Sequence, residues 1–137
     1  MNTVRIERTK RGYPALWESG GGMSNTGFAT IVTGRRGEAL KPIYIRRRGH
    51  LACSNHALFV VKLGFYVVEA DHHRGNFNIR VKRIMRIEED EAAIELVAEF
   101  SDGEWDSPPP MELSFAIAVA KEKALCYHCR EPHFIRE

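Results

Sequence analysis

The sequence predicts a mainly β protein, a single antiparallel barrel or sandwich of about eight short strands, with a C-terminal helix (an α+β fold) as the alternative. Short segments rich in Val, Ile, Phe and Tyr are separated by Gly, Asn, Asp or Pro. The connections between several of them are only three or four residues long, which is typical of an antiparallel meander. Eight strands in one small domain favour a barrel or a sandwich, because both limit exposed strand edges.

Four strands are predicted in the first half of the chain, each a short β-branched or aromatic run that ends at turn-forming residues. They are Thr3–Thr9, Gly27–Thr33, Lys41–Arg47 and Ala57–Val61. The next three are joined to their neighbours by short polar turns, which predicts consecutive antiparallel pairing. They are Phe65–Ala70, Phe77–Ile87 and Ala93–Phe100.

The strand predicted at Phe77–Ile87 has the clearest alternation. Phe77, Ile79, Val81, Met85 and Ile87 share one parity, which predicts one core face, and the opposite parity is mostly basic. Two adjacent residues break the alternation in opposite directions, since 83 is basic and 84 is apolar. This break predicts a one-residue bulge in the middle of the strand.

The segment Met111–Lys121 is compatible with two structures. Its Ala, Glu and Lys content favours a helix, and Pro110 is suited to the first helical position. Its large apolar residues alternate strictly with small or polar ones, however, whereas on a helix they would be scattered around the cylinder. We therefore favour an eighth strand here and keep the helix as the alternative.

Length and composition indicate one globular domain over residues 1–137. The chain has 137 residues, of which 44% are hydrophobic and 28% charged, with a formal net charge of +2. Its apolar runs are far shorter than the roughly 20 residues of a membrane helix, and its N-terminus does not resemble a secretory signal. Three cysteines do not suggest a disulfide framework. We therefore expect a cytoplasmic protein that does not enter a membrane.

Charge is segregated along the chain. Residues 1–87 contain 16 Lys and Arg but 5 Asp and Glu, whereas residues 88–137 contain 4 and 13. A basic segment of this size is typical of proteins that bind a nucleic acid or another polyanion, because basic side chains displace the counterions of phosphates. The alternative is that the two segments neutralise each other inside one domain.

Six residues are the predicted contacts with a nucleic acid. The basic side chains on one face of the strand at 77–87 are predicted to contact phosphates. The segment before residue 49 adds an aromatic side chain beside two arginines. The predicted contact residues are Tyr44, Arg46, Arg48, Arg80, Lys82 and Arg86. Arg35 and Arg36, at a predicted hairpin tip, are secondary candidates.

The C-terminal tail carries a candidate zinc site. Cys126 and Cys129 have the spacing of a zinc knuckle, and His133 follows them. A fourth ligand would come from elsewhere in the chain, such as Cys53, His50 or His56. The alternatives are a redox-active pair or unligated thiols in a tail, 126–137, that is flexible without a metal.

A second hypothesis is a small metal-dependent hydrolase or nuclease, so the sequence leaves open whether the protein is an enzyme. Candidate catalytic residues combine imidazoles, a carboxylate and a thiol, and they are His50, His56, Asp71, His72, His73 and Cys53. Cys53 could act as a nucleophile with His56 as its base. The simpler interpretation of Asp71–Asn76 is a polar hairpin tip, since neighbouring residues of a strand point to opposite faces.

Two further segments have alternative interpretations. The acidic part of the C-terminal third, Glu88–Glu112, supports a third hypothesis, an interaction protein that binds a basic partner or imitates nucleic acid. Gly20–Gly22 and the residues after them predict a flexible loop whose amides could hold an anion. It lacks the Gly-Lys-Ser/Thr ending of a P-loop, and a plain linker is favoured.

Overall fold

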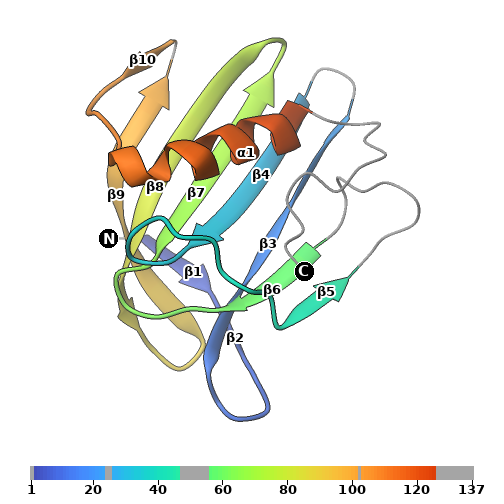
Figure 1. Ribbon diagram of the computed structural model, residues 1–137, viewed down its shortest axis with the longest axis vertical. Helices are drawn as coiled ribbons and strands as arrows, with labels where there is room; N and C mark the ends of the chain where they lie inside the picture. Colours follow the sequence, from blue (N-terminus) through green and yellow to red (C-terminus); the bar gives the residue numbers. More distant parts are fainter. Residues whose placement is uncertain (1, 24–25, 47–55, 102, 126–137) are drawn as a thin grey trace.

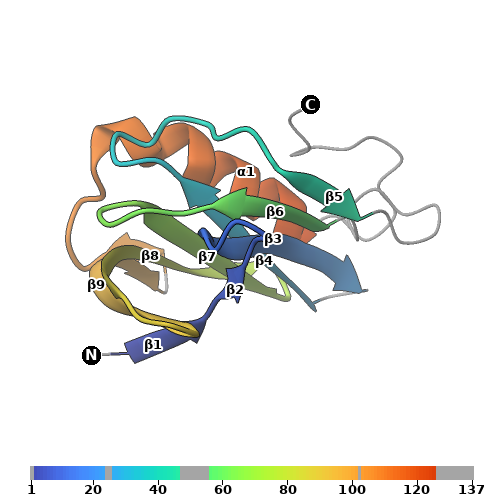
Figure 2. The ribbon, with the colours of Figure 1, turned by 90° about the horizontal axis from the view of Figure 1, so that it is seen from below.

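The computed structural model describes residues 2–23, 26–46, 56–101 and 103–125. These residues form one antiparallel sheet that curls into a half-barrel, with one C-terminal helix packed across it (Figures 1 and 2). The mainly β prediction is therefore confirmed. In chain order the elements are β1 (Asn2–Arg5), β2 (Glu7–Arg8), β3 (Pro14–Met23), β4 (Thr26–Thr33), β5 (Tyr44–Arg46), β6 (His56–Val60), β7 (Tyr66–His73), β8 (Asn76–Ile87), β9 (Glu91–Ser101), β10 (Glu104–Trp105), η2 (Met111–Leu113) and α1 (Ser114–Leu125).

The strand order is β1-β9-β8-β7-β4-β3-β6-β5, with β10 paired to β9 and β2 paired to β3. Strands β7, β8 and β9 form the predicted meander, in which Val68 pairs with Val81 and Val81 pairs with Ala98. The segment predicted as one strand, Thr3–Thr9, forms two short strands separated by Ile6, whose side chain is buried. No helix in the described ranges is long and apolar enough to cross a membrane.

Two hydrophobic clusters lie on opposite faces of this sheet. The first is packed between α1 and alternate residues of β4, β7 and β8, among them Ile31, Val68 and Ile79. The second is built from residues of the opposite parity, such as Val32 and Val67, together with Phe59 of β6. Because strand side chains alternate, one set of strands contributes to both clusters.

Strand β8 contains the predicted bulge, but its core residues differ from the prediction. The register shifts between Ile84 and Arg86, and also between Val81 and Lys82. The prediction that Met85 belongs to the core was wrong, since it is 44% exposed while Ile84 is buried. Ile84 continues the parity of Arg80 and Lys82, and at that end of the strand this parity faces the second cluster.

The prediction of a strand at Met111–Lys121 was wrong, and the helical alternative holds. The buried residues recur at helical spacing: Leu113, Ala116, Ile117, Val119, Ala120, Lys123 and Ala124. Met111 and Phe115 are 89% and 68% exposed, so the largest side chains of this segment do not face the sheet. The small alanines allow α1 to lie close over β4 and β7.

The sequence analysis missed β3, because Gly20–Gly22 were interpreted as a loop. In the structure these glycines pair with β4, Gly20 opposite Ala29 and Gly22 opposite Gly27. Gly20 has φ +145°, and a Cβ there would overlap the backbone of Phe28 and Ala29. Glycine therefore permits two strands to approach closely, rather than forming a flexible anion-binding loop.

Candidate functional site

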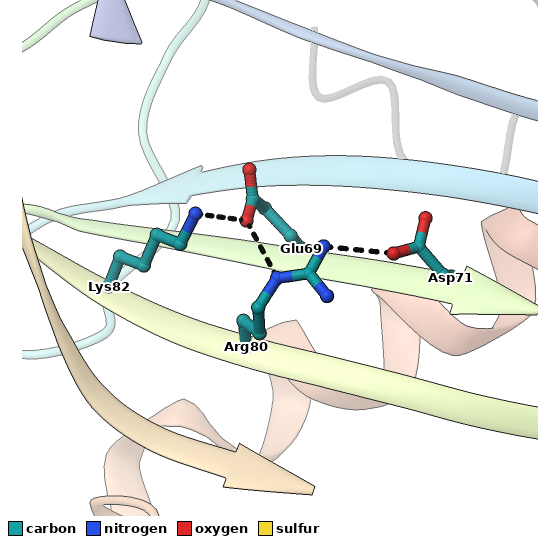
Figure 3. A network of polar contacts seen from close by, with 4 residues as sticks. All are labelled: Glu69, Asp71, Arg80 and Lys82. Carbon is teal, nitrogen blue, oxygen red and sulfur yellow. Dashed lines mark hydrogen bonds and ion pairs between the residues drawn. The ribbon is translucent and has the colours of Figure 1, made fainter. Parts of the chain in front are cut away.

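A network of ion pairs lies on the sheet face opposite α1 (Figure 3). Glu69 of β7 accepts contacts from two cations of β8 at one oxygen, Oε1, at 3.4 Å from Arg80 Nε and 2.7 Å from Lys82 Nζ. Arg80 Nη2 lies 2.9 Å from Asp71 Oδ2. The residues share this face because each occupies the same parity of an adjacent strand.

The network neutralises two of the cations, Arg80 and Lys82, that the sequence analysis placed in a nucleic-acid interface. Burial alone would lower the pKa of the Arg80 guanidinium, but the hydrogen bond that Arg80 donates to Asp71 and the charge of Glu69 outweigh burial and raise this pKa. Arg86, at the other end of β8, pairs with Glu88 at 2.8 Å. A phosphate at any of these three side chains would therefore compete with a carboxylate already in place.

Of the other predicted contact residues, those that the structure describes are not adjacent to the β8 cations. Tyr44 lies on β5, and four strands separate β5 from β8 in the sheet. Its ring packs edge-on against Trp17, with the ring centroids 5.9 Å apart. The backbone of Arg46 ends β5, and Arg48 lies outside the described residues. The six predicted residues thus do not form one patch in the described part of the chain.

A different group of cations gathers where two connections meet at one end of the sheet. We call Arg35, Arg36, Lys62 and Arg83 the loop-end cluster; all four are exposed. Arg35 Nε donates to the Leu63 carbonyl at 2.8 Å, and the Gly64 amide donates to the Ile84 carbonyl at 2.8 Å. These bonds connect the β4–β5 connection, the β6–β7 connection and the middle of β8, which approach one another in Figure 1.

Two arginines of the loop-end cluster, Arg35 and Arg83, are positioned by neutral groups. The guanidinium carbon of Arg35 lies 5.7 Å from the centre of the Phe65 ring, and that of Arg83 lies 5.5 Å from the centre of the Tyr66 ring. Among the described residues, none of the four cations has a carboxylate within ion-pair distance. Their positive charge is therefore held in place without being neutralised by a direct partner.

Two carboxylates lie near this cluster. Glu38 Oε1 accepts the Arg36 backbone N–H at 2.9 Å, and this bond, with its own backbone N–H and the charges of Arg36 and Arg35, lowers the pKa of Glu38. Glu95 is opposite Arg83 in the β8–β9 register. Cations outnumber these two carboxylates, and the backbone of a third acidic residue, Glu112, lies against Gly37 beside Arg36.

Three residues of the hydrolase hypothesis, Asp71, His72 and His73, have described side chains, and they are divided between the two faces of the sheet. His72 packs against Phe77 at 5.1 Å between ring centroids, and its Nε2 accepts the Gly75 N–H at 2.9 Å. Asp71 has the opposite parity and is bonded to Arg80. His73 has the parity of Asp71, and both line a shallow hollow at the end of β7. Asp71 and His72 therefore do not face a common ligand.

The candidate zinc residues cannot be placed by this structure. Cys126, Cys129, His133, Cys53 and His50 lie outside the described residues, and of His56 only the backbone at the start of β6 is described. Within the described ranges, no group of three or more His, Cys, Asp or Glu is close enough together to hold a metal ion.

Sequence reasoning did not identify the loop-end cluster as a unit. Arg35 and Arg36 were secondary candidates, whereas Lys62 was interpreted only as part of a turn. Arg83 broke the alternation of β8. This break was the one available signal that its side chain lies on the sheet face opposite to that of Arg80 and Lys82. The contact between the two connections depends on strand order, which the sequence does not state.

Comparison with protein-family models, curated protein sequences and solved structures found no match to this chain.

Proposed function

We propose that the protein binds nucleic acid through phosphate contacts made by the loop-end cluster, Arg35, Arg36, Lys62 and Arg83. The observation that carries the proposal is that Arg35 and Arg83 are held by a carbonyl and by aromatic rings, and that none of the four cations has a carboxylate of the described residues within ion-pair distance. A phosphate can replace water at such cations without first displacing an anionic partner. Arginine also suits this role because its planar fork matches phosphate geometry.

The partners of three cations of β8 explain why this end of the sheet is favoured over the face of β8. Arg80, Lys82 and Arg86 are bonded to Glu69, Asp71 or Glu88. Their charge is compensated inside the protein, so their contribution to counterion release is small. Because the cluster lies on two connections and on strand β8, and no helix carries it, we propose backbone recognition without base-specific contacts.

The test is fluorescence anisotropy with short single-stranded DNA, duplex DNA and RNA at about 50 and about 200 mM salt. The variant combines Arg36→Gln, Lys62→Gln and Arg83→Gln, and keeps Arg35 because its bond to Leu63 supports the connection. We expect binding to weaken and the slope of log affinity against log salt to decrease by about one per cation removed. The matched control removes three exposed cations elsewhere, with Lys10→Gln, Arg11→Gln and Arg74→Gln.

Two outcomes would overturn the proposal. One is no binding to any of the three nucleic acids at about 50 mM salt. The other is an unchanged slope in the cluster variant together with a reduced slope in the control. The rank order of the three nucleic acids identifies the preferred form.

A further inference from the structure

A cavity of about 180 Å³ lies on the sheet face opposite α1, between β1 and β3. Residues of five strands line it, and most of its wall is aliphatic. These wall residues are Val4, Leu16, Val32, Val67 and Ile94. All but Val4 are buried and belong to the second hydrophobic cluster, so the wall is fixed by the packing of the sheet.

The size of the cavity matches a single ring. An engineered apolar cavity of about 150 Å³ in another protein takes up benzene. The atoms that line an empty cavity have no dispersion contacts on the side of the cavity, and an apolar guest restores these contacts. The indole of Trp17 also lines the cavity and offers an aromatic surface to such a guest.

One wall of the cavity offers a hydrogen-bond acceptor. Glu69 lines the cavity, and its Oε1 is engaged by both Arg80 and Lys82. Figure 3 shows the second carboxylate oxygen turned away from both cations. No described residue donates a hydrogen bond to this second oxygen, although 29% of the side chain is exposed. It is therefore available to a donor on a bound molecule.

The charges around the cavity favour an uncharged guest. Two cations and two carboxylates make up the network, so it carries no net charge. An ammonium group would meet the network cations and Arg5, which also lines the cavity. A carboxylate or phosphate would meet Glu69. A neutral hydroxyl avoids both repulsions and still donates one hydrogen bond.

We propose that this cavity is a binding site for a small, uncharged aromatic alcohol. The ring packs against Val67, Ile94 and Trp17, and the hydroxyl donates to Oε2 of Glu69. This site lies on another part of the sheet from the loop-end cluster, and it does not depend on nucleic-acid binding.

The experiment is a titration of the ¹⁵N-labelled protein with phenol, followed in two-dimensional NMR spectra, with toluene as the probe that lacks a hydroxyl. We expect saturable shifts at amides of the strands that line the cavity, and at least severalfold tighter binding of phenol than of toluene. Val67→Phe fills the space and should weaken phenol binding at least tenfold. Val97→Phe is the matched control, because Val97 lies on β9 and is 36% exposed.

A second variant keeps the proposal testable if Val67→Phe does not fold. Glu69→Gln leaves the space open but replaces the charged acceptor with a weaker neutral one. It should lower phenol affinity severalfold more than toluene affinity. The proposal is overturned if wild type shows no saturable shifts, if Val67→Phe folds and binds phenol as wild type does, or if Glu69→Gln changes both affinities equally.

Discussion

At the scale of residues, the partner of each cation determines what its charge can do. Arg80 and Lys82 form ion pairs with carboxylates, so their charge is neutralised within the sheet. Arg35 and Arg83 are held by a carbonyl and by aromatic rings, so their charge remains available. Residue type alone did not distinguish these two groups.

Glu38 provides a prediction on pH. Its folded-state pKa is below the ordinary value of 4.5, chiefly because the Arg36 N–H bonds its carboxylate. A depressed folded pKa means that the ionised carboxylate stabilises the fold above pH 4.5 and that this contribution is lost as pH falls through the folded pKa. Glu38→Gln should therefore lower the urea midpoint at neutral pH, and the difference from wild type should shrink below pH 4.5.

The measurement is urea unfolding of both proteins at several pH values from about 7 to about 3. Glu104→Gln, at an exposed position of β10, controls for the loss of one negative charge. A difference between wild type and Glu38→Gln that grows as pH falls would contradict the predicted direction.

At the scale of elements, α1 shows how small residues can define a buried face. Alanines 116, 120 and 124 face the sheet, and Phe115 points away from it. The alternation of large side chains along 111–119 was genuine but did not correspond to burial. Close contact with β4 and β7 selects small residues for the inner face.

This arrangement predicts that two substitutions in α1 have unequal effects on stability. Ala120→Leu forces three carbon atoms into a fully buried position and should destabilise the protein by about 1–3 kcal/mol. Phe115→Ala removes a large side chain that is 68% exposed and should change stability by less than about 0.5 kcal/mol.

Urea unfolding of the two variants measures both effects. If Phe115→Ala were the more destabilising of the two, Phe115 would face the core, as the strand interpretation required.

At the scale of the whole molecule, the two hydrophobic clusters share the strands that separate them. Val68 belongs to the first cluster and its neighbour Val67 to the second. Loss of one cluster therefore removes support from the other, and we expect the described fold to unfold as one cooperative unit.

The two tryptophans of the chain test this expectation, because they report on different clusters. Trp105 packs against the first cluster, and Trp17 lines a cavity together with Leu16, Val32 and Val67 of the second. The single-tryptophan variants Trp105→Phe and Trp17→Phe should each show one fluorescence transition in urea. That transition should coincide with the loss of circular dichroism measured on the same variant.

Within either variant, a fluorescence midpoint clearly separated from the circular dichroism midpoint would contradict cooperative unfolding. It would indicate that the cluster reported by the remaining tryptophan unfolds independently.

The sequence predicted much of the sheet and less of the candidate site. Local alternation identified β4, β6, β7, β8 and β9 to within a few residues, because side-chain period is a local property. It did not identify β3, whose glycines pair with β4 only because the strands approach closely there. The loop-end cluster also escaped prediction as a unit, since its members come from three separated segments.

The sequence by itself determined the mainly β fold, the bulge in β8 and the segregation of basic and acidic residues, since each depends on neighbours in the chain. Only the tertiary structure decided which cations are neutralised, which face of α1 is buried and where a cavity remains. These properties depend on contacts between residues far apart in the chain. Strand order brings Glu69 beside Lys82 and Arg35 beside Leu63, and no local pattern encodes that order.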